Sequence, residues 1–95
     1  MGKFEKGKLL MTAGVRNLMN EDNSFEAFVA WSFINRYCEC DWGEMCEEDK
    51  ALNDEAVKNG DDRIFAAYEK EGLPKIYIIT EWDRSATTIL FPDEY

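Results

Sequence analysis

The chain has 95 residues, of which 45% are hydrophobic and 14% aromatic, so one core can form without disulfides or a structural metal. We therefore expect a single domain over residues 1–95. No run of about eighteen apolar residues is present, which excludes a membrane-spanning helix. Only three apolar residues, Leu9-Leu10-Met11, follow the basic start, too few for a signal peptide. These features favour a cytoplasmic protein that is not bound to a membrane.

The charge distribution separates the chain into two parts. Eleven basic and twenty acidic residues give a net charge of −9. Residues 1–40 contain five of each sign, whereas residues 41–95 contain six basic and fifteen acidic residues. Direct binding to nucleic acid is not expected, because phosphate contacts need clustered Lys and Arg. A protein partner with a basic surface is compatible with this field, and the alternative is an acidic surface that only keeps the chain soluble.

The first third of the chain predicts a short strand and two helices. The strand would be Lys8–Met11, and Thr12 is placed to cap a helix over residues 12–20. Asn23 followed by Glu26 resembles a capping box that opens a second helix over residues 24–37. That helix is apolar almost all round, Trp31 included, and is therefore expected to be the most buried element.

A third helix is predicted over residues 43–59. Asp41 would be its N-cap, Glu44 the reciprocal capping partner, and Gly60 its stop signal. The expected buried stripe consists of Met45, Leu52, Ala56 and Val57. The expected solvent-facing acids are Glu47, Glu48, Asp54 and Glu55.

Beyond Gly60 the hydrophobic pattern alternates, which predicts three strands near residues 63–69, 75–82 and 87–91. Their short connections favour an antiparallel meander. Helices followed by strands indicate an α+β fold, with the three helices on one face of the sheet. The other face, which would include Tyr77 and Ile79, should be partly exposed.

Catalytic and metal-binding signals are weak. Cys38, Cys40 and Cys46 have neither the ligand number nor the spacing of a structural zinc site, so we expect free thiols, no metal and no cofactor. The chain has no histidine, which removes the commonest general base at neutral pH. Glu81 and Asp83, beside Arg84, are the best-placed carboxylates, but we favour their interpretation as a salt-bridged turn at the end of the strand. We expect a protein that is not an enzyme.

Two tryptophans have two interpretations each. Trp42, before the third helix, and Trp82, at the end of the middle strand, could pack in the core or act as interface anchors.

Two segments, "CDWGEMCEEDKALNDEAVKNGDDRI" and "IYIITEWDRSATTILFPDEY", carry a family resemblance. The chain resembles short proteins encoded on plasmids, integrative elements and phages of Firmicutes and other bacteria, labelled "plasmid-related protein" or type I restriction subunit M. The match covers roughly residues 35–95. No residues suited to a methyl donor or to DNA are evident, so the resemblance implies a mobile-element origin and leaves the mechanism open.

Two functional hypotheses follow. The first is an anti-defence inhibitor, of the anti-CRISPR or antirestriction type, that binds a basic nucleic-acid-binding surface of a host protein. The alternative is a regulatory or structural accessory protein of a phage or plasmid that acts through a small hydrophobic contact. In either case a monomer or weak homodimer is expected. The candidate partner-binding residues are Trp42, Glu44, Glu47, Glu48, Asp54, Glu55, Glu81 and Asp83.

Overall fold

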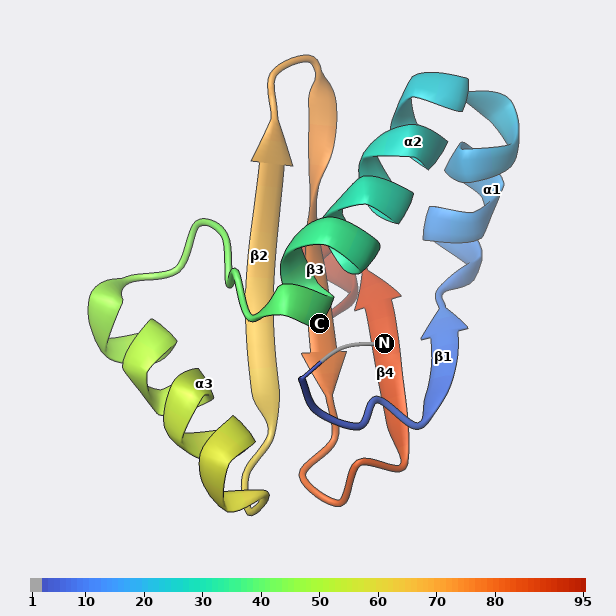
Figure 1. The fold of residues 1–95 in the computed structure, drawn as a ribbon. Coiled ribbons are helices and arrows are strands. Elements are labelled where there is room, and N and C mark those ends of the chain that lie inside the picture. Colours follow the sequence, from blue (N-terminus) through green and yellow to red (C-terminus); the bar gives the residue numbers. More distant parts are fainter. Residues whose placement is uncertain (1–2) are drawn as a thin grey trace.

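The computed structural model describes residues 3–95 and confirms the α+β class, with a four-stranded sheet and three α-helices (Figure 1). The elements in chain order are β1 (Lys8–Met11), α1 (Ala13–Glu21), α2 (Asn23–Trp31), a π-helical segment η1 (Ser32–Arg36), a 3-10 turn η2 (Tyr37–Glu39), α3 (Glu47–Asn59), β2 (Ile64–Lys70), β3 (Leu73–Thr80), β4 (Ala86–Leu90) and a 3-10 turn η3 (Pro92–Glu94).

The sheet has the strand order β1-β4-β3-β2. Strands β2, β3 and β4 form the predicted antiparallel meander, in which Ile78 of β3 lies between Ala66 of β2 and Ile89 of β4. The predicted short N-terminal strand is also present, and it pairs in parallel with β4. The connection from β1 to the next strand, β2, contains α1, α2 and α3, and it is long enough to return the chain for a parallel pairing.

The core lies between α2 and one face of the sheet. Phe25 and Val29 of α2 are buried against Ile76 and Ile78 of β3, and Tyr37 closes the end of this layer. The alternation predicted for β3 is confirmed on this face. Among the described residues, no helix is long and apolar enough to cross a membrane.

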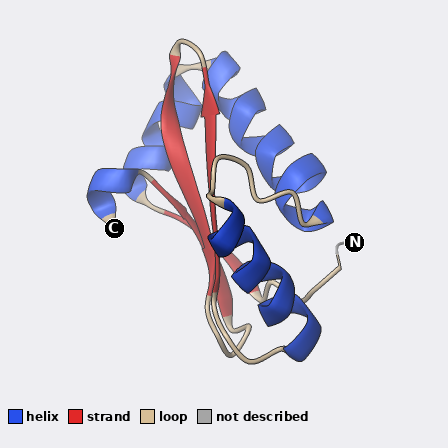
Figure 2. Ribbon diagram, turned by 90° about the vertical axis from the view of Figure 1, so that its left-hand side faces the viewer, coloured by secondary structure: helices blue, strands red, loops and turns tan. Residues whose placement is uncertain are grey.

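The helices do not all cover one face, contrary to our expectation. In Figure 2 the sheet is seen edge-on, with α2 on one side of it, α3 beside the outermost strand β2, and the C-terminal turn η3 on the opposite side. The reason is the loop before α3, which runs along β2 and delivers the helix to the edge of the sheet.

The second helix is less regular and less buried than predicted. Its N-cap is Asp22, whose carboxylate accepts the amide hydrogens of Ser24 and Phe25. The α-helix ends at Trp31, and π-helical and 3-10 turns continue it to residue 39. Trp31, expected in the core, is 62% exposed.

Candidate functional site

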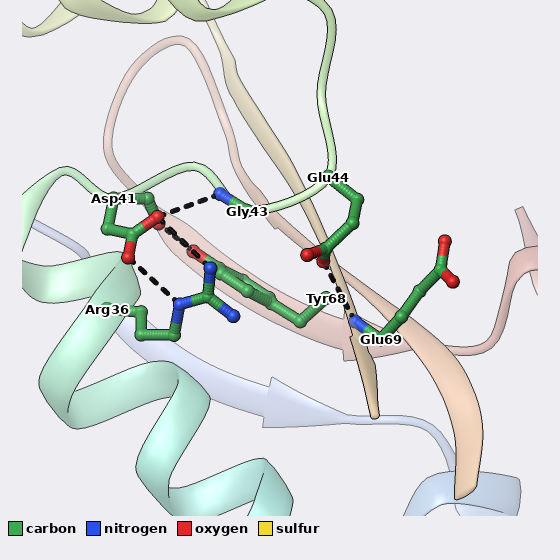
Figure 3. Close-up of polar contacts among 6 residues, drawn as sticks. All are labelled: Arg36, Asp41, Gly43, Glu44, Tyr68 and Glu69. Carbon is green, nitrogen blue, oxygen red and sulfur yellow. Dashed lines mark hydrogen bonds and ion pairs between the residues drawn. The ribbon is translucent and has the colours of Figure 1, made fainter. Parts of the chain in front are cut away.

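Residues 41–46 form a loop that is fixed on the free edge of β2. The backbone carbonyl of Trp42 accepts the Ala67 amide at 3.4 Å, and the Glu44 amide donates to the Ala67 carbonyl at 2.7 Å. The Glu44 carboxylate accepts the Glu69 amide at 3.0 Å (Figure 3). The predicted role of Glu44 as a helix-capping partner is therefore wrong. One oxygen of its carboxylate instead holds the loop on β2.

Asp41 anchors the start of this loop, as Figure 3 shows. Its carboxylate accepts hydrogen bonds from Arg36 at 2.9 Å and from the Gly43 amide at 3.1 Å. The bond from Arg36 is the main reason that the pKa of Asp41 lies below its usual value. The Tyr68 hydroxyl, whose pKa is raised chiefly by burial, donates to the Asp41 carbonyl at 2.6 Å. The predicted N-cap role of Asp41 is wrong because these partners occupy its carboxylate.

The third helix therefore begins at Glu47, four residues later than predicted, and ends as expected before Gly60. Its predicted buried stripe is also partly wrong. Leu52 is 60% exposed, whereas Asn53 is buried, and the Asn53 side-chain amide bonds both the carbonyl of Phe65 at 2.7 Å and its amide at 3.2 Å. A polar side chain thus replaces a neighbouring strand at the edge of β2.

Trp42 is only 3% exposed and packs against Phe4 and Tyr37, so the core interpretation holds and it cannot anchor a partner in this conformation. Its indole N–H donates to the Asp54 carboxylate at 2.8 Å. Asp54 is exposed, as expected, and its carboxylate also satisfies the one polar atom of a buried indole.

A groove of about 470 Å³ lies between α3 and the sheet face opposite the core. Its apolar floor includes the rings of Phe65 and Tyr77, whose centroids are 4.8 Å apart. The complete lining is Glu44, Met45, Asp49, Leu52, Asn53, Asp62, Arg63, Phe65, Ala67, Lys75 and Tyr77. Tyr77, expected on a partly exposed sheet face, thus lines one wall of a groove, whereas Ile79, expected on the same face, is buried with an exposed fraction of 8%.

The charged side chains of this groove differ in whether they already have partners within the chain. Lys75 pairs with Glu69 at 3.4 Å, whereas Arg63 bonds the neutral Tyr95 hydroxyl and lies over the Phe65 ring at 5.3 Å, so its charge has no ion-pair partner within residues 3–95. The Asp49 carboxylate also makes no ion pair or side-chain hydrogen bond within residues 3–95. The groove therefore has three acids, Glu44, Asp49 and Asp62, and two cations around an aromatic floor. Of the three carboxylates, only that of Asp49 makes no hydrogen bond within residues 3–95.

The predicted acids of α3 add further negative charge beside the groove. Glu47, Glu48 and Glu55 are exposed, and Glu47 pairs with Lys50 at 3.7 Å. Glu48, Leu52 and Glu55 are spaced i, i+4, i+7 and so lie along one line of the helix. An exposed leucine between two carboxylates combines an apolar contact with negative charge.

Glu81 and Asp83 lie apart from this surface, in the β3–β4 turn near the C-terminal end of α3. Asp83 accepts the Ser85 amide at 3.0 Å, and hydrogen bonds from Ser85 lower its pKa. Arg84 donates to the carbonyls of Ala56 at 2.8 Å and Asp62 at 2.7 Å. The turn is a structural clamp on the end of α3, and within residues 3–95 Arg84 forms no salt bridge with these acids.

The three cysteines are free thiols in the structure. Burial raises the pKa of Cys38 and of Cys40, which makes them poorer nucleophiles and metal ligands. Among the described residues, no group of three or more His, Cys, Asp or Glu side chains is placed to hold a metal. The expectation of a metal-free protein remains a prediction.

Asp49, Leu52, Asp62 and Phe65 belong to the groove but were not among the predicted site residues. Only Leu52 carried a signal, because it is a leucine surrounded by acids. No protein-family model, no curated protein and no solved structure matches this chain.

Proposed function

We propose that the protein is a non-enzymatic binding protein whose acidic groove holds a basic segment of another protein. The observation that carries this proposal is a groove with an aromatic floor that is lined by three acids, Glu44, Asp49 and Asp62, and by two cations, Arg63 and Lys75, in a chain of net charge −9. Glu48 and Glu55 extend the same field along α3.

The expected ligand has a mixed chemistry. An apolar side chain would contact Leu52, Phe65 and Tyr77, while flanking Lys or Arg side chains would meet the carboxylates of the rim. Exposed ion pairs contribute only about 0–1 kcal/mol each, so the apolar contact supplies affinity and the charges supply orientation and speed of association.

The resemblance to mobile-element proteins indicates where such a partner would be sought. A host defence protein that binds nucleic acid has a basic channel, and an acidic protein seated there would block it. The proposed function is therefore that of an anti-defence inhibitor, and the partner is a basic protein surface rather than nucleic acid itself.

A matched pair of variants tests the proposal. The site variant is Glu48→Gln/Asp49→Asn/Glu55→Gln, which leaves the structural Glu44 and Asp54 intact. The control, Glu5→Gln/Glu21→Gln/Glu71→Gln, changes the net charge by the same amount at exposed positions elsewhere. Proteins captured from a bacterial lysate at low and high salt are then identified by mass spectrometry.

We expect basic proteins to be retained by the wild type and the control, lost with the site variant, and released by high salt. If the site variant retains the same proteins as the control, the acidic groove is not the binding surface.

A further inference from the structure

A second surface, on the opposite side of the core from the groove, has no role in the proposed function. Ala27, Ala30, Trp31 and Ile34 are all exposed and form a continuous apolar stripe along α2 and η1. The exposed fractions of Trp31 and Ile34 are 62% and 60%. The inner side of the same helix packs in the core, so this helix is apolar on both sides although only one is covered.

We propose that this outer stripe is the interface between two copies of the chain, packed as an antiparallel helix pair about a twofold axis. The stripe contains both a projection and a recess. A groove of about 490 Å³ adjoins it. Its lining is Ser24, Ala27, Phe28, Trp31, Ser32 and Arg36 of the helical segment together with Glu69 and Lys70 of β2. A twofold axis lets Trp31 of each copy enter the groove of the other, which makes the surface self-complementary.

Charge supports a second copy as the occupant. The acidic excess of the chain lies in residues 41–95, whereas residues 1–40, which contain the stripe, have no net charge. Two copies that meet here bring only one acid of the acidic half, Glu69, close to the contact, and Glu69 pairs with Lys75 at 3.4 Å. Contact through the acids of α3 would instead bring like charges together. The small side chains of Ala27 and Ala30 also permit close approach of two helices.

The ends of the stripe favour the antiparallel arrangement. Glu26 lies at its start and Arg36 at its end, so a twofold axis brings Glu26 of one copy alongside Arg36 of the other. Asp41 uses the Nε and Nη2 atoms of Arg36, and the remaining guanidinium donors are available for a second carboxylate.

The backbone is irregular directly beneath this stripe. The α-helix changes to a π-helix immediately after Trp31, and the buried Ser32 hydroxyl has no hydrogen-bond partner within residues 3–95. Such turns cost stability and are frequent at functional sites. Here the π-helical turn sets the direction in which the stripe continues from Trp31 to Ile34.

Sedimentation equilibrium of the full chain, from about 10 µM to about 1 mM, tests the proposal. We expect the mass to rise from the 11.0 kDa of a single chain toward twice that value. Added salt should strengthen this association, because it screens repulsion between two acidic chains. Added salt should instead weaken the capture of a basic partner, so the two proposals can fail independently.

Trp31→Lys should weaken self-association at least tenfold. Trp82→Lys is the matched control, because Trp82 is 64% exposed and lies in the β3–β4 turn. Both side chains are exposed, so both variants should keep the wild-type circular dichroism spectrum. A wild-type chain that remains at monomer mass at the highest concentration and in high salt overturns the proposal, and a heterologous partner would then be the occupant to seek. Equal effects of the two substitutions also overturn it.

Discussion

Single residues in the loop before α3 have roles that the sequence pattern could not reveal. Asp41, Gly43 and Glu44 satisfy the local rules for a helix start, yet Asp41 bonds to Arg36 and Glu44 to the Glu69 amide. Gly43 has a positive φ of 75°, and a Cβ at this position would collide with the Ala67 carbonyl. The requirement for glycine thus comes from the close approach of the loop to β2.

Replacement of Asp41 by Asn should destabilise the protein in a pH-dependent way. The bond from Arg36 lowers the pKa of Asp41 in the folded state, so its contribution is present above the unfolded pKa of about 4 and is lost as the pH falls through the folded value. At pH 7 we expect a loss of about 0.5–1 kcal/mol in the free energy of unfolding, because the pair is partly exposed, with side-chain exposures of 28% for Arg36 and 52% for Asp41. Urea denaturation at a series of pH values measures it.

The difference between wild type and Asp41→Asn should shrink toward zero below about pH 3. Asp61→Asn is the control, because Asp61 is exposed and its carboxylate makes no hydrogen bond within residues 3–95. A difference that stays constant from neutral to acid pH would show that the charge of Asp41 is not what matters.

At the scale of elements, the strands and the stop of α3 could be predicted because they depend on local signals. The period-two alternation gave β3, and Gly60 adopts the left-handed conformation of a helix stop. The start of α3 could not be predicted, because residues 41–46 pair with β2 more than twenty positions away. The groove could not be predicted for the same reason, because α3 and β3, which both line it, come together only in the folded chain.

The edge of β2 is closed by three different devices: the Asn53 side chain at Phe65, the loop backbone at Ala67, and the Glu44 carboxylate at Glu69. An open edge strand is a template for pairing with other chains. The loop of residues 41–46 therefore serves largely to cover a sheet edge.

Asn53→Ala should remove the part of this cover at Phe65, near the start of β2. Two hydrogen bonds to Phe65 are lost and a backbone amide is left without a partner, so we expect about 2 kcal/mol less stability. Hydrogen exchange at the Phe65 amide should accelerate more than exchange in β3. Asn17→Ala, at an exposed position of α1, should change stability by less than about 0.5 kcal/mol. Unchanged exchange at Phe65 would argue against a capping role for Asn53.

At the scale of the whole molecule, two separate surfaces and one structural turn surround the core. The acidic groove lies beside α3, the uncharged stripe lies on the outer side of α2, and Arg84 clamps the turn near the end of α3. The two proposed interfaces are on different sides of the sheet. The two proposed contacts therefore use different residues of the chain.

A network of buried hydroxyl groups connects the helical layer to the sheet. The Tyr37 hydroxyl bonds Thr80 at 2.6 Å, Thr80 bonds Thr87 at 2.7 Å, and Thr87 donates to the Lys6 carbonyl at 2.7 Å. It links the end of the helical layer to β3, to β4 and to the N-terminal segment. Burial raises the pKa of Tyr37, which keeps this hydroxyl protonated as the network requires.

Thr80→Val should lower the stability of the whole domain by about 1–3 kcal/mol, because the isosteric methyl group leaves the buried Tyr37 hydroxyl without a partner. Since the network joins four segments, the slowest-exchanging amides throughout the sheet should all lose protection, unlike the local effect expected for Asn53→Ala. Thr88→Val is the control: Thr88 points to the other face of β4, and its hydroxyl makes no hydrogen bond within residues 3–95. Chemical denaturation and hydrogen exchange on both variants test this prediction. If Thr80→Val and Thr88→Val had equal free energies of unfolding, the hydroxyl network would not contribute to the stability of the fold.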